Sequence, residues 1–191
     1  EASSFYKRET SDFTSNVLVD WASALPKIVD KENDQCQIQM IAHPNLSKDD
    51  KTVLEKTLDD KDRDEYLDQI ADHIILGAEE FAKGNRDRTL RLELFYWLIT
   101  TKRMILKFAF PKHIPRPGIF HKKVGIFHFP WGDKVAFQGG ANETVGGMHR
   151  NIESIDVYHS WKEEGLERIN EKERKCVVSF YLHSQSYKKI P

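Results

Sequence analysis

Between Gly118 and Thr144 the sequence is GIFHKKVGIFHFPWGDKVAFQGGANET, and the rest of the chain is best interpreted around this segment. Two runs rich in valine, isoleucine and phenylalanine flank the turn-forming PWGD, which predicts two strands joined by a hairpin. The first run also holds a histidine and two lysines, and the second ends in two glycines and an asparagine. A strand pair that only packs does not need so polar a set.

The first strand sorts these side chains onto two faces, because residues two apart in a strand point to the same side. His121 and Lys123 therefore project together, on the face that also holds Gly125 and Phe127. The valine and the isoleucine between them point the other way, into a layer of helices.

The second strand, Lys134–Gly140, returns beside the first, and its glycines let another group approach the backbone closely. Asn142 then opens a short segment whose backbone N–H groups can receive an anion. A histidine, a lysine, bare backbone and an amide at one end of a sheet predict a phosphate site. Taken singly, the H-x-K tripeptide occurs by chance, GGAN forms a tight turn, and NIESIDV (151–157) forms a buried strand.

Composition sets wide bounds on the function. The chain has 191 residues and a formal net charge of −1, which suits one globular domain and leaves a local basic patch possible. No apolar run is long enough to span a bilayer, and the N-terminal segment has no signal-peptide core. Cys36 and Cys176 form no metal-type pair and are expected to be reduced thiols, which predicts a cytoplasmic location.

Periodicity elsewhere predicts an α/β fold, with a mixed β-sheet sandwiched between helices. The elements that precede the hairpin are a helix from about Ser15 to Pro26, a strand at Cys36–His43, a helix from Ser47 to about Leu58, helices at Asp62–Gly84 and Arg88–Arg103, and a strand at Met104–Phe110. A solvated helix end and a last strand are expected after the hairpin. Residues 1–191 are interpreted as a single domain excised from a longer protein.

The motifs together resemble the phospholipase D superfamily, the HKD phosphodiesterases. Their motif is H-x-K, an acid, a G-G-x-N or G-S-x-N segment and a second acid. The phrases GIFHKKVGIF, AFQGGANET and NIESIDVYHSW are similar to those of the nuclease domains that precede helicase modules in bacterial restriction and defence proteins. The chain differs from the pattern at two positions: His128 stands at the first acid, where Asp133 is the nearest carboxylate, and Gly140 replaces the frequent serine.

The resemblance implies a PLD-like fold with one HKD motif per chain and a set of catalytic roles. His121 attacks phosphorus and forms a phosphohistidine, while Glu153 holds its other ring nitrogen. Lys123 and Asn142 bind the non-bridging oxygens and stabilise the transition state. The substrate-binding residues implied are Lys122, Gly139 and Gly140.

The resemblance also implies partners. A second histidine must protonate the leaving oxygen, and HSQSYKK near the C-terminus has Gln185 where a second motif needs its lysine. An identical chain would supply that histidine, in a homodimer through the active site. The expected activity is a metal-independent DNA endonuclease without cofactor, cytoplasmic, without a membrane partner, in restriction or antiphage defence, beside a fused or associated helicase or ATPase.

Two other functions fit the sequence. One is a catalytically impaired relative that binds DNA or holds an assembly together, and the other is a phosphodiesterase on lipid or another small substrate. A basic rim for DNA and solvated surface charge explain the same lysines and arginines, which are Lys112, Arg116, Lys122, Lys123, Lys134 and Arg150. The aromatic residues Phe120, Phe127, Phe129 and Trp131 suit core and hairpin packing better than base stacking. The histidines lack ligand partners at metal-site spacing.

Overall fold

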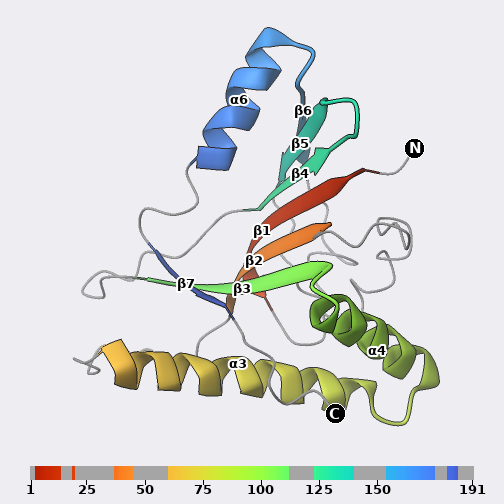
Figure 1. Ribbon diagram of the computed structural model, residues 1–191, viewed down its shortest axis with the longest axis vertical. Coiled ribbons are helices and arrows are strands. Elements are labelled where there is room, and N and C mark those ends of the chain that lie inside the picture. The colour runs from red at the N-terminus through yellow and green to blue at the C-terminus, as the bar shows by residue number, and fades with distance from the viewer. Residues whose placement is uncertain are drawn as a thin grey trace.

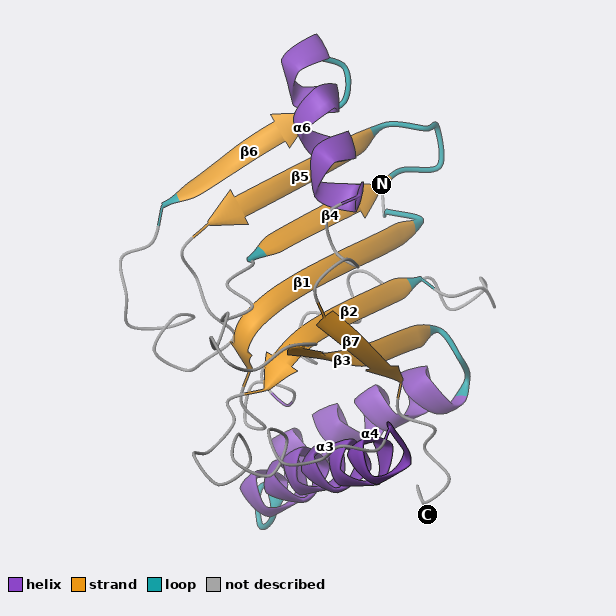
Figure 2. Ribbon diagram, turned by 90° about the vertical axis from the view of Figure 1, so that its left-hand side faces the viewer, coloured by secondary structure: helices purple, strands orange, loops and turns teal. Residues whose placement is uncertain are grey.

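The computed structural model describes residues 3–13, 19, 37–44, 60–111, 123–139, 154–174 and 180–184. These residues form a seven-stranded sheet in the order β6-β5-β4-β1-β2-β3-β7, with three long helices (Figures 1 and 2). The strands are β1 (Phe5–Phe13), β2 (Ile38–Pro44), β3 (Met104–Pro111), β4 (Val124–His128), β5 (Lys134–Gly139), β6 (Ile155–His159) and β7 (Phe180–Ser184). The helices are α3 (Asp60–Ala82), α4 (Arg86–Thr100) and α6 (Glu163–Arg174).

The predicted α/β class with a mixed sheet is confirmed. Strands β1, β2 and β3 run parallel to one another, and the remaining four pair antiparallel with their neighbours. The hairpin, strand β2 and the long helices α3 and α4 lie within a few residues of their predicted bounds. The helix predicted from Ser15 lies outside the described residues except for Val19, which is helical and buried, and the helix predicted from Ser47 lies wholly outside them.

Strand β1 was not predicted, although it lies at the centre of the sheet between β4 and β2. Its sequence, FYKRETSDF, places charged or hydroxyl side chains on both faces, so neither face has the apolar alternation that signals a strand. Arg8 and Glu9 are nonetheless buried, as are Thr10 and Ser11. A strand of this composition forms only because its neighbours supply the pairing on both sides.

One face of the sheet, here called the α3–α4 face, carries the main hydrophobic core. Tyr6, Ile38 and Met104 are opposite one another on β1, β2 and β3 and point into it. They pack in one cluster with Phe95 and Leu98 of α4 and with small residues of α3. Fully burying such large apolar side chains is worth about 1.5–3 kcal/mol each, which accounts for the stability of this half.

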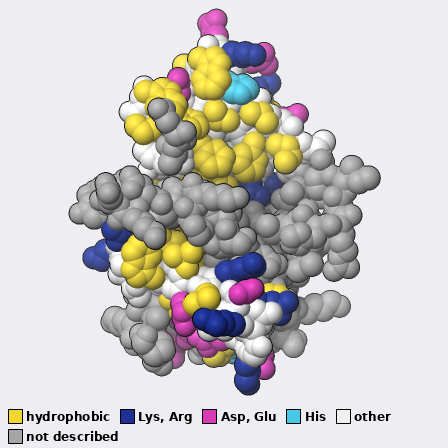
Figure 3. All heavy atoms as spheres, turned by 90° about the vertical axis from the view of Figure 1, so that its right-hand side faces the viewer, with side chains coloured by type: hydrophobic (Ala, Val, Ile, Leu, Met, Phe, Trp, Pro, Cys, Tyr) yellow, Lys and Arg dark blue, Asp and Glu magenta, His cyan; other side chains and the backbone are white. Residues whose placement is uncertain are grey.

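The opposite face, here called the α6 face, carries a smaller core at the other end of the sheet. Val124, Ile126 and Ala136 of the hairpin pack with Ile169 of α6, and Tyr158 of β6 joins them. The three helices therefore cover the sheet from opposite faces and at opposite ends (Figure 1). On the α3–α4 face of β6, Ile155 and Val157 are more than half exposed, and Figure 3 shows hydrophobic side chains gathered at this end of the molecule.

Candidate functional site

Lys123 and Gly139, two residues of the predicted motif, lie opposite each other across the hairpin. The backbone N–H of Gly139 donates a hydrogen bond to the carbonyl oxygen of Lys123 over 3.2 Å. Lys123 directly precedes β4 and Gly139 is the last residue of β5. Only 8% of Lys123 is exposed, so its charge is held within the protein rather than on a rim.

The other predicted site residues lie outside the described part of the chain. They are the catalytic residues His121, Asn142 and Glu153 and the substrate-binding residues Lys122 and Gly140. The described residues that lead to them in sequence are Lys123, Gly139 and Ser154, and all three lie at one end of the sheet. Lys123 and Gly139 are thus the members of the predicted set whose positions can be compared.

Gly139 is a glycine because β6 approaches it. A Cβ atom at this position would lie 2.8 Å from the carbonyl oxygen of Ser154 and 2.9 Å from Cγ1 of Ile155. The sequence predicted a close approach to this backbone, and the neighbouring strand is the group that makes it. Gly139 is therefore in contact with β6 where a side chain would be, and its N–H is bonded to Lys123.

This end of the sheet is the end at which ligands bind in open α/β folds. Glu9, the middle residue of β1, pairs with Val124 at the start of β4, so Lys123 lies beside the half of the sheet that leads to the carboxyl ends of the three parallel strands. The crevice outside those carboxyl ends is the usual ligand position in such sheets.

Several buried polar side chains at this end were missed from the sequence. Arg8 is 5% exposed, Glu9 is 2% exposed and His43 at the end of β2 is 8% exposed. The Nζ atom of Lys7 lies 3.1 Å from Oε1 of Glu9, and Nδ1 of His43 lies 2.8 Å from the carbonyl oxygen of Ala109. The sequence has no periodic signal for Arg8 and Glu9, because their strand carries charged or hydroxyl side chains on both faces.

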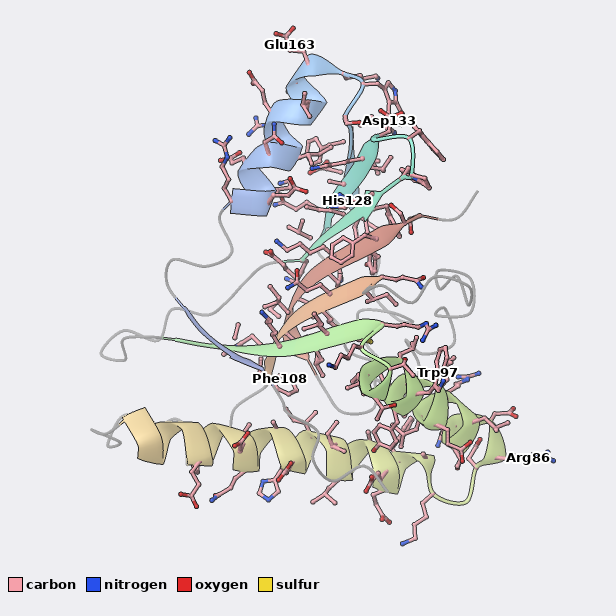
Figure 4. The ribbon with its side chains drawn as sticks, viewed as in Figure 1. Arg86, Trp97, Phe108, His128, Asp133 and Glu163 are labelled. Carbon is pink, nitrogen blue, oxygen red and sulfur yellow. The ribbon has the colours of Figure 1, made fainter. Side chains whose placement is uncertain are left out.

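His128, which stands where the family pattern has its first acid, points to the α6 face and away from Lys123. Its Nε2 atom lies 3.2 Å from Oε1 of Glu173 on α6 (His128 is labelled in Figure 4). Burial lowers the pKa of His128 below its usual range, and Lys134 lowers it further, while Glu173 opposes both. At neutral pH the imidazole of His128 is therefore uncharged where it contacts the carboxylate.

Lys134 is the ionic partner of Glu173 in the same cluster. Its Nζ atom lies 3.0 Å and 2.9 Å from the two carboxylate oxygens. The sequence suggested Lys134 as part of a basic rim around the site, and this interpretation is wrong because the residue begins β5 at the end opposite Gly139 and points to the α6 face.

Asp133 belongs to the hairpin turn and not to the site (Figure 4). Its two carboxylate oxygens accept hydrogen bonds from Nε1 of Trp131, at 2.9 Å, and from the hydroxyl of Ser160, at 3.1 Å. Trp131 also stacks on Phe129, with ring centroids 4.9 Å apart, as the hairpin-packing interpretation expects. Asp133 therefore joins the hairpin turn to the turn that follows β6.

The described residues contain no group of three or more histidine, cysteine, aspartate or glutamate side chains placed to hold a metal ion. None of the helices in the described ranges is long and apolar enough to cross a membrane. Comparison of the sequence with protein-family models and with curated proteins gives no match.

Proposed function

We propose that the chain is a metal-independent phosphodiesterase domain of the phospholipase D type that cuts DNA as an endonuclease. The observation that carries the proposal is the pair formed by Lys123 and Gly139, a buried lysine joined by a backbone hydrogen bond to the glycine of the motif, toward the carboxyl ends of the parallel strands. In sequence, His121 precedes this pair by two residues, and Asn142 and Glu153 follow it in the order of the HKD motif.

In the first step, a ring nitrogen of His121 forms a bond to phosphorus, and the bond from phosphorus to the leaving oxygen breaks. Lys123 and Asn142 bind the non-bridging oxygens, whose negative charge grows as the bond forms. The carboxylate of Glu153 accepts a hydrogen bond from the N–H of the other nitrogen of the same ring and fixes its tautomer. The leaving oxygen takes a proton from a second histidine.

In the second step, water attacks the phosphohistidine, and the second histidine accepts the proton that the water loses. The bond between His121 and phosphorus breaks, which restores the ring for the next cycle. Because the chain has one motif, His121 of a second copy is proposed as the second histidine, in a two-fold homodimer.

The position of His128 favours an active enzyme over a silenced relative. His128 is the departure from the family pattern that lies within the described residues, and it is held by Glu173 on the face opposite Lys123. A histidine in place of the acid on that face therefore does not remove a side chain from the proposed site, which lies on the other face. At Gly140, the second departure, the proposed contact to phosphate is made by backbone N–H.

DNA is proposed as the substrate because the phrases around the motif resemble those of the helicase-linked nucleases. We propose the same setting for this domain: a cytoplasmic restriction or antiphage protein, with a fused or associated helicase or ATPase. A lipid or another small phosphodiester is the competing substrate class.

The test is cleavage of supercoiled plasmid by the purified chain in excess EDTA, with light scattering to measure the dimer. We expect nicked or linear DNA from the parent and a loss of at least about 1,000-fold in His121→Ala, which removes the nucleophile. The matched control is His73→Ala, at an exposed position on α3, and it should cut as the parent does.

Other outcomes contradict the proposal in distinguishable ways. A folded dimer that binds plasmid without cutting it indicates the binding module. Hydrolysis of phosphatidylcholine without cleavage of plasmid indicates the lipid-directed enzyme. Cleavage that is unchanged in His121→Ala rules out the phosphohistidine route.

A further inference from the structure

Arg8 and Lys123 are neighbours on the α3–α4 face, although they come from opposite parts of the sequence. Arg8 of β1 lies directly opposite Gly125 of β4, and Lys123 precedes Gly125 by two residues on the same face. Such diagonal neighbours in an antiparallel pair are about 7–8 Å apart, within reach of long side chains. Figure 2 shows β1, β4 and β5 side by side in the middle of the sheet.

The side chain of Arg8 extends over β4 toward β5. Its guanidinium carbon lies 5.2 Å from the centroid of the Phe137 ring, and Phe137 is opposite Gly125 on β5. A Cβ atom on Gly125 would lie 2.1 Å from that ring, so the ring of Phe137 fits over β4 because Gly125 has no side chain. Gly125 and Phe137 therefore hold Arg8 over the strands that carry Lys123 and Gly139.

Both cations are buried, with 5% of Arg8 and 8% of Lys123 exposed. Arginine and lysine are rarely buried so far, and each brings a cationic side chain to the same sheet face. The planar guanidinium suits phosphate because it donates two parallel hydrogen bonds, whereas an ammonium acts as a point charge. The pair therefore has the chemistry of a phosphate clamp.

We propose that Arg8 is a phosphate-binding residue, whose guanidinium binds, together with Lys123, the anionic oxygens of a phosphodiester at this end of the sheet. This inference rests on the proposed function, since it adds a residue to the same site. Arg8 lies outside the HKD motif and on a strand that the sequence did not predict. Its charge would stabilise the added negative charge of the pentacoordinate transition state, with no bond formed to Arg8 itself.

The competing role for Arg8 is purely structural, as the partner of a carboxylate of this chain. Glu9 follows Arg8 in sequence, but its side chain points to the opposite, α6 face of the sheet, where Lys7 contacts it. Adjacency in sequence therefore does not make Glu9 that partner. A structural role predicts that removal of Arg8 lowers stability but leaves phosphate affinity unchanged.

The experiment measures binding of inorganic phosphate to the full chain by calorimetry, in parallel with the rise of Tm on adding phosphate. The variants are Arg8→Met, which removes the charge, and Arg8→Lys, which keeps the charge and removes the planar fork. The matched control is Arg103→Met: Arg103 also stacks on an aromatic ring, at 4.9 Å from that of Trp97, but lies at the opposite end of the sheet.

We expect the Kd for phosphate to rise at least about tenfold in both Arg8 variants and to stay unchanged in Arg103→Met, because only Arg8 donates a charge-assisted bidentate contact. If Arg8→Met does not fold, Arg8→Lys gives the answer. Phosphate binding that is equal in the parent and in Arg8→Lys overturns the inference, as does a parent that binds no phosphate.

A second arm separates this inference from the proposed function. The parent and Arg8→Lys are assayed with bis(p-nitrophenyl) phosphate and with plasmid in EDTA, where kcat/KM should fall in the variant. Arg8-dependent phosphate binding without any hydrolysis sinks the nuclease proposal and keeps the inference. DNA cleavage together with phosphate binding that does not depend on Arg8 supports the nuclease proposal and overturns the inference about Arg8.

Discussion

The hydrogen bond from the N–H of Gly139 to the carbonyl oxygen of Lys123 connects the two halves of the motif directly. It closes the hairpin at the end farthest from its turn, so the lysine and the bare backbone share one place on the sheet. Neighbouring β6 then limits what this position can hold, because the carbonyl oxygen of Ser154 is too near for a side chain.

Gly139→Ala is expected to lower the free energy of unfolding by about 1–3 kcal/mol, the usual cost of inserting a methyl group where no space exists. The added Cβ would lie 2.8 Å from a backbone oxygen, which cannot rotate away as a side chain can. Urea denaturation measures the change. Ser154→Ala, which keeps that carbonyl, is the control and should stay within about 0.5 kcal/mol of the parent. Equal stabilities of the two variants would contradict the steric explanation.

Asp133→Ala is expected to destabilise the protein by about 0.5–1.5 kcal/mol while plasmid cleavage by the folded protein is retained, because the carboxylate accepts hydrogen bonds from Trp131 and Ser160 and lies away from the site. Stability is measured by urea denaturation, and cleavage is measured well below the melting temperature. The control is Asp156→Ala, an exposed carboxylate on β6. A loss of cleavage in folded Asp133→Ala would instead make Asp133 the functional equivalent of the family's first acid.

The pH dependence of stability should contain a contribution from His128. The pKa of His128 is lowered from its ordinary 6.5 in the folded state, first by burial, then by Lys134, with a smaller lowering from Lys7 and an opposing effect of Glu173. Below pH 6.5 the unfolded chain therefore binds more protons at this residue than the folded chain does. The free energy of unfolding should fall as the pH drops through 6.5 and level off below the lowered folded pKa.

Urea denaturation between about pH 7.5 and about pH 5.5 tests this. His128→Gln, which cannot titrate, should show a smaller decrease over that range than the parent, whatever its absolute stability. His159→Gln removes a histidine at the end of β6 and keeps the His128 cluster, so it should retain the larger decrease. Identical slopes in His128→Gln and the parent would show that His128 does not contribute.

The ion pair between Lys134 and Glu173 should couple α6 to the hairpin. The contact is bidentate and both side chains are about a quarter exposed, so a double-mutant cycle with Lys134→Met and Glu173→Gln should give about 1 kcal/mol. The exposed pair Arg168–Glu171, 3.7 Å apart, is the comparison and should give about 0.3 kcal/mol or less. Chemical denaturation of the four proteins in each cycle measures both values, and equal coupling in the two cycles would refute the difference.

Periodicity predicted most of the described elements because their signals are local. Helix α3 repeats apolar residues at helical spacing, α4 is a long apolar segment, and β2 and the hairpin have short apolar runs bounded by turn-forming residues. The sequence predicted that these two strands lie side by side, and the structure supplied the register in which Lys123 lies opposite Gly139.

The sequence alone thus determined the α/β class, the hairpin and the face on which Lys123 lies, because each depends on residues close together in the chain. Only the tertiary structure placed β1 between β2 and β4, since its polar side chains carry no strand signal and its pairing is with distant segments. The same long-range pairing brought Arg8 beside Lys123, and the packing of α6 brought Glu173 to His128. Contacts between segments far apart in sequence depend on which strands and helices pack together, and local periodicity contains no information on that choice.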